Sequence, residues 1–252
     1  MTKSKVEKAR RYVRRIGCVA LTLVLVTATM TTPVNAKAKS KKKSAAKTFT
    51  VYADAGHGCL YQTAATQGPM GFAAIGAAGE AAYTASFAQY YIAATNMTGT
   101  VKAKGISELS LNGIQGSNLT FGNSGRSALF AASGCDAMIQ FHYDKMTPES
   151  NAGAHVIYSN NSANSIYLAY CIATAMKAAG CRMNDYYPMH ISERHELSSY
   201  KVPLSKPLVM IELGMGVPGE TDADYLRDPA NIAMITNAIN QGVANYRALL
   251  GL

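Results

Sequence analysis

The segment TFTVYADAGHGCLYQ, residues 48–62, begins as a strand and then turns abruptly polar. Its first residues have the alternating apolar pattern of a buried strand, and Gly56-His57-Gly58 follows directly. Glycine tolerates positive φ and close approach to other groups, so the two glycines let the His57 side chain point away from the strand end. We interpret His57 as a candidate functional residue. The alternative is a turn that happens to contain a histidine.

Outward from this segment, predicted strands alternate with predicted helices along the chain. The predicted strands are TFTVYAD (48–54), TVKAKGI (100–106), DAMIQFH (136–142), AGAHVIYS (152–159) and PLVMIELG (207–214). The predicted helices cover 80–95, a stretch beginning near Ser124, 163–180, closed by Gly180 as a C-cap, and 228–250, with Pro229 in its first turn. This order predicts an α/β fold, with a mostly parallel twisted sheet and helices on both faces. The continuous apolar runs AMIQF and LVMI favour strands that are covered on both sides.

The first 47 residues differ in composition from the rest of the chain. Residues 1–36 combine seven Lys and Arg residues, an apolar run from Ile16 to about Met30 and the small-residue site Pro33-Val34-Asn35-Ala36. This layout predicts a secretory signal peptide cleaved after Ala36, and hence a secreted, extracellular protein. The apolar run is shorter than the ~20 residues that span a bilayer, so we expect no stable membrane span after cleavage. We expect residues 37–47 to form a lysine-rich linker and residues 48–252 to form a single folded domain.

The formal net charge of +9 comes from these first 47 residues. They hold 13 of the 24 Lys and Arg residues but only 1 of the 15 Asp and Glu residues, so residues 48–252 carry a net charge of −3. A mildly acidic domain without a basic stripe excludes nucleic acid as the expected partner. The lysine-rich linker either adheres to anionic envelope polymers or serves as a solubilising spacer.

The four cysteines after the predicted signal peptide do not suggest a disulfide framework. Ten residues of predicted helix separate Cys171 from Cys181, or about 15 Å at the rise of an α-helix, whereas a disulfide tolerates at most ~7 Å between Cα atoms. We interpret Cys59, Cys135, Cys171 and Cys181 as small buried apolar residues.

Three polar residues follow apolar strands at the point where each strand ends. They are His57, His142 and Glu212, and Glu80 opens the helix after the first strand. The carboxyl ends of parallel strands lie along one edge of a sheet, where ligands bind, so we expect these side chains to meet there. Two imidazoles and a carboxylate suit zinc, and a second carboxylate suits the general base for a water molecule. Taken singly, each of these side chains also fits a structural role.

The ordered motifs resemble those of the zinc-dependent N-acetylmuramoyl-L-alanine amidases of bacterial cell walls, the type 3 amidase family. The motifs are VYADAGHG, a helix-opening glutamate, GRSALFAASGCDAMIQFHYD, AGAHVIYS and PLVMIELGMG, between about Val51 and Tyr246. The resemblance implies zinc as the cofactor, bound by His57, Glu80 and His142, with Glu212 as the catalytic residue. Arg126 matches an arginine of the family, and we interpret it as structural.

The sequence departs from the family pattern at three places. Cys59 stands where the family usually has glycine, Tyr143 replaces a small residue after His142, and the gap of 23 residues from His57 to Glu80 is longer than usual. Glu80 is nevertheless the only carboxylate between His57 and Glu108. Tyr143 is expected to alter the rim of the site.

The remaining histidines are expected to lie outside the catalytic set. We interpret His155 as a packed or edge residue of its strand, and His190 and His195 as part of a solvated loop, with a place along the cleft as the alternative.

The resemblance implies hydrolysis of the amide between N-acetylmuramic acid and L-alanine of the peptidoglycan stem peptide. Zinc would activate a water molecule, and Glu212 would accept its proton and pass it to the departing amine. A zinc carboxypeptidase of related fold that acts on wall peptides and a non-catalytic wall-binding protein are the alternatives. A Ser-His-Asp hydrolase finds no support, because the chain has no G-x-S-x-G elbow.

Overall fold

The computed structural model describes residues 48–56, 80–98, 101–105, 129–144, 152–159, 162–194, 206–216 and 218–252. These ranges all belong to one compact unit, Ala45–Leu252. The predicted signal peptide and lysine-rich linker lie outside the described residues, as do four side chains that the sequence singles out: His57, Cys59, Arg126 and His195.

Six strands form one sheet in the order β2-β1-β3-β6-β4-β5. The strands are β1 (Phe49–Ala55), β2 (Val101–Gly105), β3 (Ala137–His142), β4 (His155–Ser159), β5 (Ile191–Arg194) and β6 (Leu208–Glu212). β1 pairs in parallel with β2 and β3, and β3 pairs in parallel with β6. β4 pairs antiparallel with β6, and β5 runs parallel to β4. The sheet is therefore mostly parallel, as predicted, but its two strands beyond β6 run in the opposite direction.

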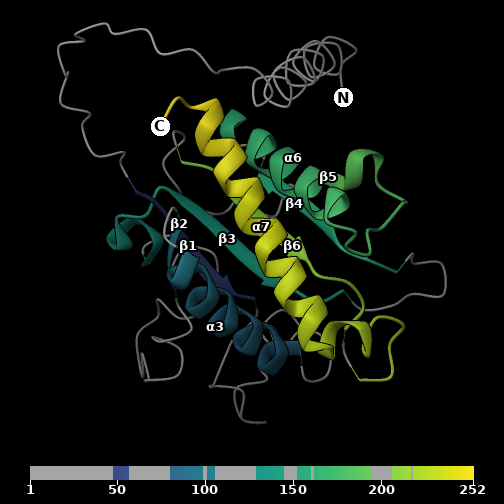
Figure 1. Ribbon diagram of the computed structural model, residues 1–252. Coiled ribbons are helices and arrows are strands. Elements are labelled where there is room, and N and C mark those ends of the chain that lie inside the picture. Colours follow the sequence, from purple (N-terminus) through teal and green to yellow (C-terminus); the bar gives the residue numbers. More distant parts are fainter. Residues whose placement is uncertain are drawn as a thin grey trace, which may run out of the picture. The chain divides into compact units, whose positions relative to one another are not determined.

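Three long helices cover one face of the sheet, as Figure 1 shows. They are α3 (Glu80–Thr98), α6 (Ala163–Ala178) and α7 (Pro229–Leu249). The rings of Phe87 and Tyr91 on α3 lie 5.0 and 5.1 Å from the ring of Phe141 on β3. Aromatic pairs at this distance add to the stabilisation that burial of their surfaces already provides, so they fix α3 against the centre of the sheet.

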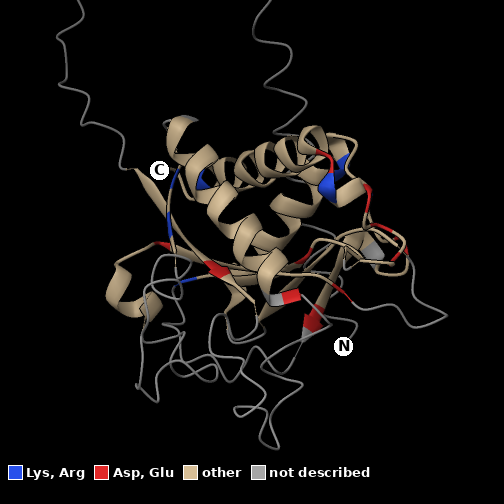
Figure 2. Cartoon of the chain, turned by 90° about the horizontal axis from the view of Figure 1, so that it is seen from below, with Lys and Arg blue, Asp and Glu red and all other residues tan. Residues whose placement is uncertain are grey.

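The opposite face is also covered by helical residues. Residues 129–133 are helical, and the Phe130 ring lies 5.9 Å from the ring of Tyr52 on β1. Tyr52 pairs with Met138, three residues before Phe141, so it points to the face away from α3. Figure 2, turned by 90°, shows α3, α6 and α7 together on one side of the sheet. The prediction of helices on both faces is confirmed.

The ends of the long helices follow from local sequence. Asp228 accepts a hydrogen bond from the Ala230 amide at the start of α7, and Pro229 occupies the first turn. Gly180 follows α6 with φ +82°, a conformation that glycine adopts at low cost. Two short 3₁₀-helices, η3 (Pro188–His190) and η5 (Tyr225–Arg227), complete the described elements.

The sequence prediction missed strand β5. Its residues, Ile-Ser-Glu-Arg, are few and mostly polar because β5 is an edge strand with one neighbour, so they carry no buried apolar run. None of the helices in the described ranges combines the length and the apolar content of a membrane span.

The cysteine prediction is confirmed for the three cysteines that the structure describes. Cys135, Cys171 and Cys181 are buried and free of disulfides. Burial raises the pKa of the Cys171 and Cys181 thiols to about 11, so both stay protonated at neutral pH.

Candidate active site

The candidate site lies at one edge of the sheet, where β3 and β6 end. His142 is the last residue of β3 and Glu212 is the last residue of β6, and the two are register partners on these adjacent strands. Side chains of register partners lie on the same face of a sheet. Glu212 is 4% exposed, so its carboxyl group is largely shielded from bulk water. The structure therefore brings two of the predicted site residues together.

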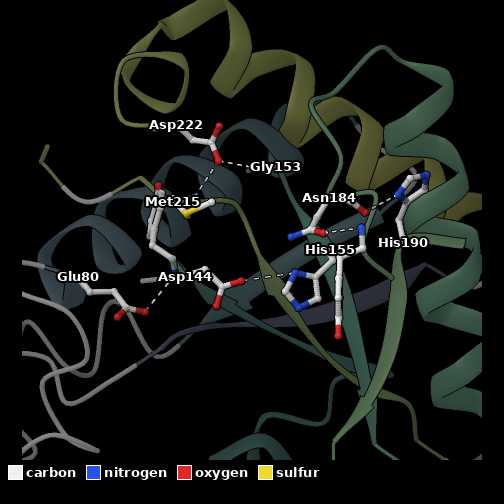
Figure 3. Close-up of polar contacts among 10 residues, drawn as sticks. Glu80, Asp144, Gly153, His155, Asn184, His190, Met215 and Asp222 are labelled. Carbon is white, nitrogen blue, oxygen red and sulfur yellow. Dashed lines mark hydrogen bonds and ion pairs between the residues drawn. The ribbon is translucent and has the colours of Figure 1, made fainter. Parts of the chain in front are cut away.

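Glu80 reaches the same place from the first turn of α3. Its Oε1 atom lies 3.3 Å from Nδ1 of His142 and accepts a hydrogen bond of 3.0 Å from the Tyr143 backbone amide. Glu80 is buried, and Figure 3 shows its side chain beside the end of β3. The long gap between His57 and Glu80 does not prevent Glu80 from reaching His142.

The end of β1 also lies against His142. The Gly56 amide donates a 2.8 Å hydrogen bond to the Phe141 carbonyl, and a Cβ atom at Gly56 would stand 2.4 Å from Nε2 of His142. Only glycine leaves room for the imidazole at this position. Thr84 on α3 donates a 2.9 Å hydrogen bond to the Gly56 carbonyl. The residue just before His57 is thus packed onto the second histidine, while His57 itself lies outside the described residues.

A buried polar pair joins β1 and β3 just inside this edge. Gln140 donates a 2.6 Å hydrogen bond to Asp54, its register partner, and both side chains are buried. A buried carboxylate is stabilised when it accepts hydrogen bonds, so this pair fixes the two strands where they approach the site.

The chemistry of the donors near His142 fits a zinc ion. The imidazole nitrogen of the partly buried His142 and the carboxylate oxygen of the buried Glu80 lie close together at a strand end, and both are ligands that zinc accepts. Within the described ranges no cluster of three or more His, Cys, Asp or Glu side chains has the arrangement of a metal site. The third predicted ligand, His57, follows Gly56 directly in the sequence but is not among the residues described.

His155 and Asp144 belong to this edge as well, and the sequence analysis did not place either of them there. Because β4 runs antiparallel to β6, its first residue, His155, is the register partner of Glu212. Nδ1 of His155 lies 3.6 Å from Oδ2 of Asp144, and the Tyr187 ring stacks on the imidazole at 4.3 Å between centroids. Figure 3 shows Asp144 and His155 side by side. The prediction that His155 is a packed residue is correct, because it is 0% exposed, but its position beside Glu212 is new.

Asp222 joins the segments that lead into and out of the site. Its Oδ2 atom accepts hydrogen bonds from the amides of Gly153, two residues before His155, and Met215, three residues after Glu212, at 2.7 and 3.0 Å. Its Oδ1 atom lies 2.8 Å from a guanidinium nitrogen of Arg182. Asp222 is fully buried, and Figure 3 shows it between the two segments. It therefore holds the start of β4 against the end of β6.

The prediction of a solvated loop around His190 is wrong for that residue. His190 is buried, with Nε2 2.7 Å from the Lys177 ammonium nitrogen and Nδ1 2.8 Å from the Asn184 carbonyl oxygen. The Lys177 ammonium group can only donate, so Nε2 accepts and Nδ1 carries the proton that is donated to Asn184. These contacts give His190 a structural role, in the segment that leads into β5.

Tyr143 is buried and does not form an exposed rim. Its ring lies 6.2 Å from that of Tyr83, and a Cβ atom at Gly216 would stand 2.3 Å from it. Burial raises the pKa of the Tyr143 phenol, so it remains neutral throughout the physiological range. Its contribution to the site is the backbone amide that binds Glu80.

Comparison with known structures supports the fold. The amidase Ami1 of Mycobacterium smegmatis has a TM-score of 0.58 at 20% sequence identity, over 79% of this chain and 97% of that one. An N-acetylmuramoyl-L-alanine amidase of Clostridium difficile 630 has a TM-score of 0.57 at 16% identity, over 80% and 97%. AmiC2 of Nostoc punctiforme has a TM-score of 0.56 at 17% identity, over 79% and 97%.

The sequence itself was also compared with known proteins and families. No curated protein matches it in sequence. The sequence pattern of the N-acetylmuramoyl-L-alanine amidases, in contrast, matches residues 51–245, which include all described strands except the first two residues of β1, and most of α7. The chain therefore belongs to the type 3 N-acetylmuramoyl-L-alanine amidase family.

Proposed function

We propose that this protein is a zinc-dependent hydrolase that cleaves the amide between N-acetylmuramic acid and the L-alanine of peptidoglycan stem peptides. Membership of the amidase family supports peptidoglycan as the substrate. The observation that carries the proposal is the approach of Glu80 to within 3.3 Å of His142, with Glu212 in register on the next strand. A ligand pair beside a separate carboxylate is the arrangement that metal-assisted amide hydrolysis requires.

His142 and Glu80 are the described residues that would hold zinc, together with His57 from the end of β1. When bound, zinc supplies Lewis-acid polarisation of the substrate carbonyl and lowers the pKa of a coordinated water. The Tyr143 amide keeps Glu80 in place through its hydrogen bond to Oε1. Gly56 leaves the space that the His142 imidazole occupies.

Glu212 is the proposed proton carrier. Its carboxylate accepts a proton from the attacking water and delivers it to the amine that leaves as the amide bond breaks. An amine is a poor leaving group unless it is protonated, so the same side chain serves both halves of the reaction. Its register with His142 on the neighbouring strand supports this role.

The test is the digestion of purified peptidoglycan, with the products identified by mass spectrometry. Wild-type protein should release intact stem peptides with free L-alanine amino ends, and a chelator should abolish the release until zinc is restored. Glu212→Gln, which keeps the size of the side chain but cannot accept the proton, should slow release by about 10²–10⁴-fold. Its zinc content and melting temperature should match those of the wild type.

Other products would contradict the proposal in distinguishable ways. Shortened stem peptides that remain attached to the glycan would indicate a carboxypeptidase. Binding to the wall without release of any product, and without zinc in the purified protein, would indicate a non-catalytic wall-binding protein.

The proposal includes export of the protein to the cell wall. Residues 1–36 have the layout of a signal peptide, and the lysine-rich residues 37–47 have a charge that suits anionic envelope polymers. Sequencing the amino terminus of protein recovered from the medium should find Lys37 first. Replacing the six lysines of residues 37–47 by glutamine should weaken binding to anionic wall polymers in low salt, while the rate on soluble muropeptides stays unchanged.

A further inference from the structure

We propose that His155 is a positioning residue that holds the carboxyl group of Glu212 in its reactive orientation. This inference rests on the proposed function, since it assigns to His155 a role in the proton transfers of Glu212. It names a residue outside the zinc and catalytic set that the sequence predicted.

The register of the sheet places His155 beside Glu212. Glu212 has His142 as its partner on β3 and His155 as its partner on β4, so the three side chains form a row across three adjacent strands. Directly opposite residues of an antiparallel pair have Cβ atoms about 4.5–5.5 Å apart, within reach of polar side chains of this size. The row exists because β4 reverses direction, which brings its amino end to the edge where β3 and β6 end.

Two neighbours fix the imidazole of His155: Asp144 at the Nδ1 edge of the ring, and Tyr187 on one of its faces. The Asp144 carboxylate lies 3.6 Å from Nδ1, and its negative charge favours a proton on that nitrogen. The Tyr187 ring stacks on the imidazole at an interplanar angle of 24°. The side chain is also 0% exposed, so it is not free to swing into solvent. A ring fixed in these ways presents its Nε2 edge in a constant direction.

The backbone that carries His155 is tied to the backbone that follows Glu212. Asp222 accepts hydrogen bonds from the amides of Gly153 and Met215, so the segment just before His155 and the segment just after Glu212 share one anchor. At Gly153, φ is +99° and a Cβ atom would stand 2.6 Å from the Met183 carbonyl carbon, so this turn requires glycine. The structure thus fixes the spacing between β4 and β6 at the level of His155 and Glu212.

His190 provides a contrast within the same molecule. It is also buried at the amino end of a strand, but its ring nitrogens bond to the Lys177 ammonium group and the Asn184 carbonyl, and it is not a register partner of Glu212. His155 has the carboxylate of Asp144 on one side and lies opposite Glu212 on the neighbouring strand. We therefore assign a structural role to His190 and the proposed positioning role to His155.

The experiment compares His155→Leu and His155→Gln in the wild-type and Glu212→Gln backgrounds, using soluble muropeptide as substrate. His155→Leu should lower kcat about 10–100-fold and leave KM unchanged, because His155 is 0% exposed and acts in this proposal through Glu212. His155→Gln, which keeps an amide near the position of Nε2, should recover part of kcat. In the Glu212→Gln background, His155→Leu should have no further effect on kcat, because the group that it positions is already gone.

His190→Gln is the matched control, since it removes a buried and bonded histidine outside the row. It should lower the melting temperature without changing kcat. Equal losses from His155→Leu in both backgrounds, or a loss of kcat in His190→Gln as large as in His155→Leu, would overturn the positioning role. If His155→Leu does not fold, His155→Gln is used in its place. A wild-type kcat in His155→Gln, with the loss caused by Glu212→Gln unchanged, contradicts the proposal when the His155 ring signal described next is also unmoved.

A second measurement does not depend on activity. In protein labelled with ¹⁵N-histidine, Glu212→Gln should shift the ring nitrogens of His155, identified by their loss in His155→Gln, and should leave those of His190 unchanged. An unmoved His155 signal would overturn the contact. If the signal moves but wild-type protein releases no stem peptide, the proposed function fails while the pairing of His155 with Glu212 stands.

Discussion

The two halves of the sheet bring different chain ends to the same edge. In the half formed by β2, β1, β3 and β6, all strands are parallel, and the edge receives their carboxyl ends with His142 and Glu212. In the half formed by β4 and β5, the strands are reversed, and the edge receives their amino ends with His155. A site built at this boundary can therefore use residues that finish one strand and residues that begin another.

The halves also differ in what they bring to the site. The parallel half supplies the candidate zinc ligand His142 and the candidate proton carrier Glu212, which a sequence shows as polar residues after apolar runs. The reversed half supplies His155, which contacts the Asp144 carboxylate and the Tyr187 ring. His155 lies beside Glu212 only because β4 runs antiparallel to β6. Four substitutions test whether the halves work as one unit, beginning with the largest expected effect.

Asp222→Ala should separate the two halves. It leaves the buried amides of Gly153 and Met215 without their acceptor and removes the partner of Arg182, so we expect a loss of about 2–5 kcal/mol in the free energy of unfolding. The rate of stem-peptide release should fall as well, because β4 and β6 lose their common anchor. Chemical denaturation and the muropeptide assay measure both effects. Asp224→Ala, at a fully exposed carboxylate two residues away, is the control and should change neither quantity.

Gly56→Ala should perturb the parallel half alone. The added methyl group would stand 2.4 Å from the His142 ring and 2.5 Å from the Phe141 carbonyl oxygen, so we expect a loss of about 1–3 kcal/mol and a lower zinc content. Thermal unfolding and metal analysis report the two effects. Gly134→Ala serves as the comparison, because that glycine has φ +71° but nothing within 4 Å of an added Cβ. If Gly134→Ala also lowers the zinc content, close packing at Gly56 is not the reason for the effect.

Tyr187→Leu should perturb the reversed half alone. It removes the ring stacked on His155, at a cost of about 0.5–1.5 kcal/mol beyond the buried area, and frees the imidazole to rotate. We expect kcat to fall while zinc content stays constant. Tyr186→Leu removes a neighbouring ring that is 71% exposed and should leave kcat unchanged. A fall in zinc content in Tyr187→Leu would show that the reversed half also affects zinc binding, which contradicts this division between the two halves.

Glu193→Gln should have the smallest effect, at the outer pair of strands. Burial, and then the charge of Glu193, raise the pKa of Tyr158 to about 12, and its hydroxyl donates to Glu193 at 3.2 Å. Because the folded pKa lies above the unfolded value of about 10, this phenol stabilises the fold below pH 10, and the contribution is lost as the pH rises from 10 to 12. Glu193→Gln should lower the Tyr158 pKa and narrow that window, with a change in stability at pH 7 within about 0.5 kcal/mol. ¹³C NMR of labelled tyrosine rings follows the titration. An unchanged Tyr158 pKa in Glu193→Gln would show that the charge of Glu193 does not contribute to the raised pKa.

The parallel half could be predicted from the sequence, and the reversed half could not. Apolar runs marked β1, β3 and β6, and the polar residues that end them identified His142 and Glu212. The run AGAHVIYS identified β4 but not its direction, because alternation and apolar content are the same for a strand read either way. In an all-parallel sheet His155 would lie at the far edge, which is why the sequence did not connect it with Glu212. Strand β5 and the buried hydrogen bonds of His190 were not predicted, because polar residues in a short segment indicate solvent exposure unless their partners are known.

The gap of 23 residues between His57 and Glu80 is compatible with a place for Glu80 beside His142. Gly56 and Glu80 both touch His142, and Thr84 ties α3 back to the Gly56 carbonyl, so the two ends of residues 57–79 are anchored at neighbouring points. Closing a connection of twice the length adds only about 0.6 kcal/mol of entropy cost. The number of residues between Gly56 and Glu80 can therefore change at a small cost in free energy while Glu80 stays beside His142.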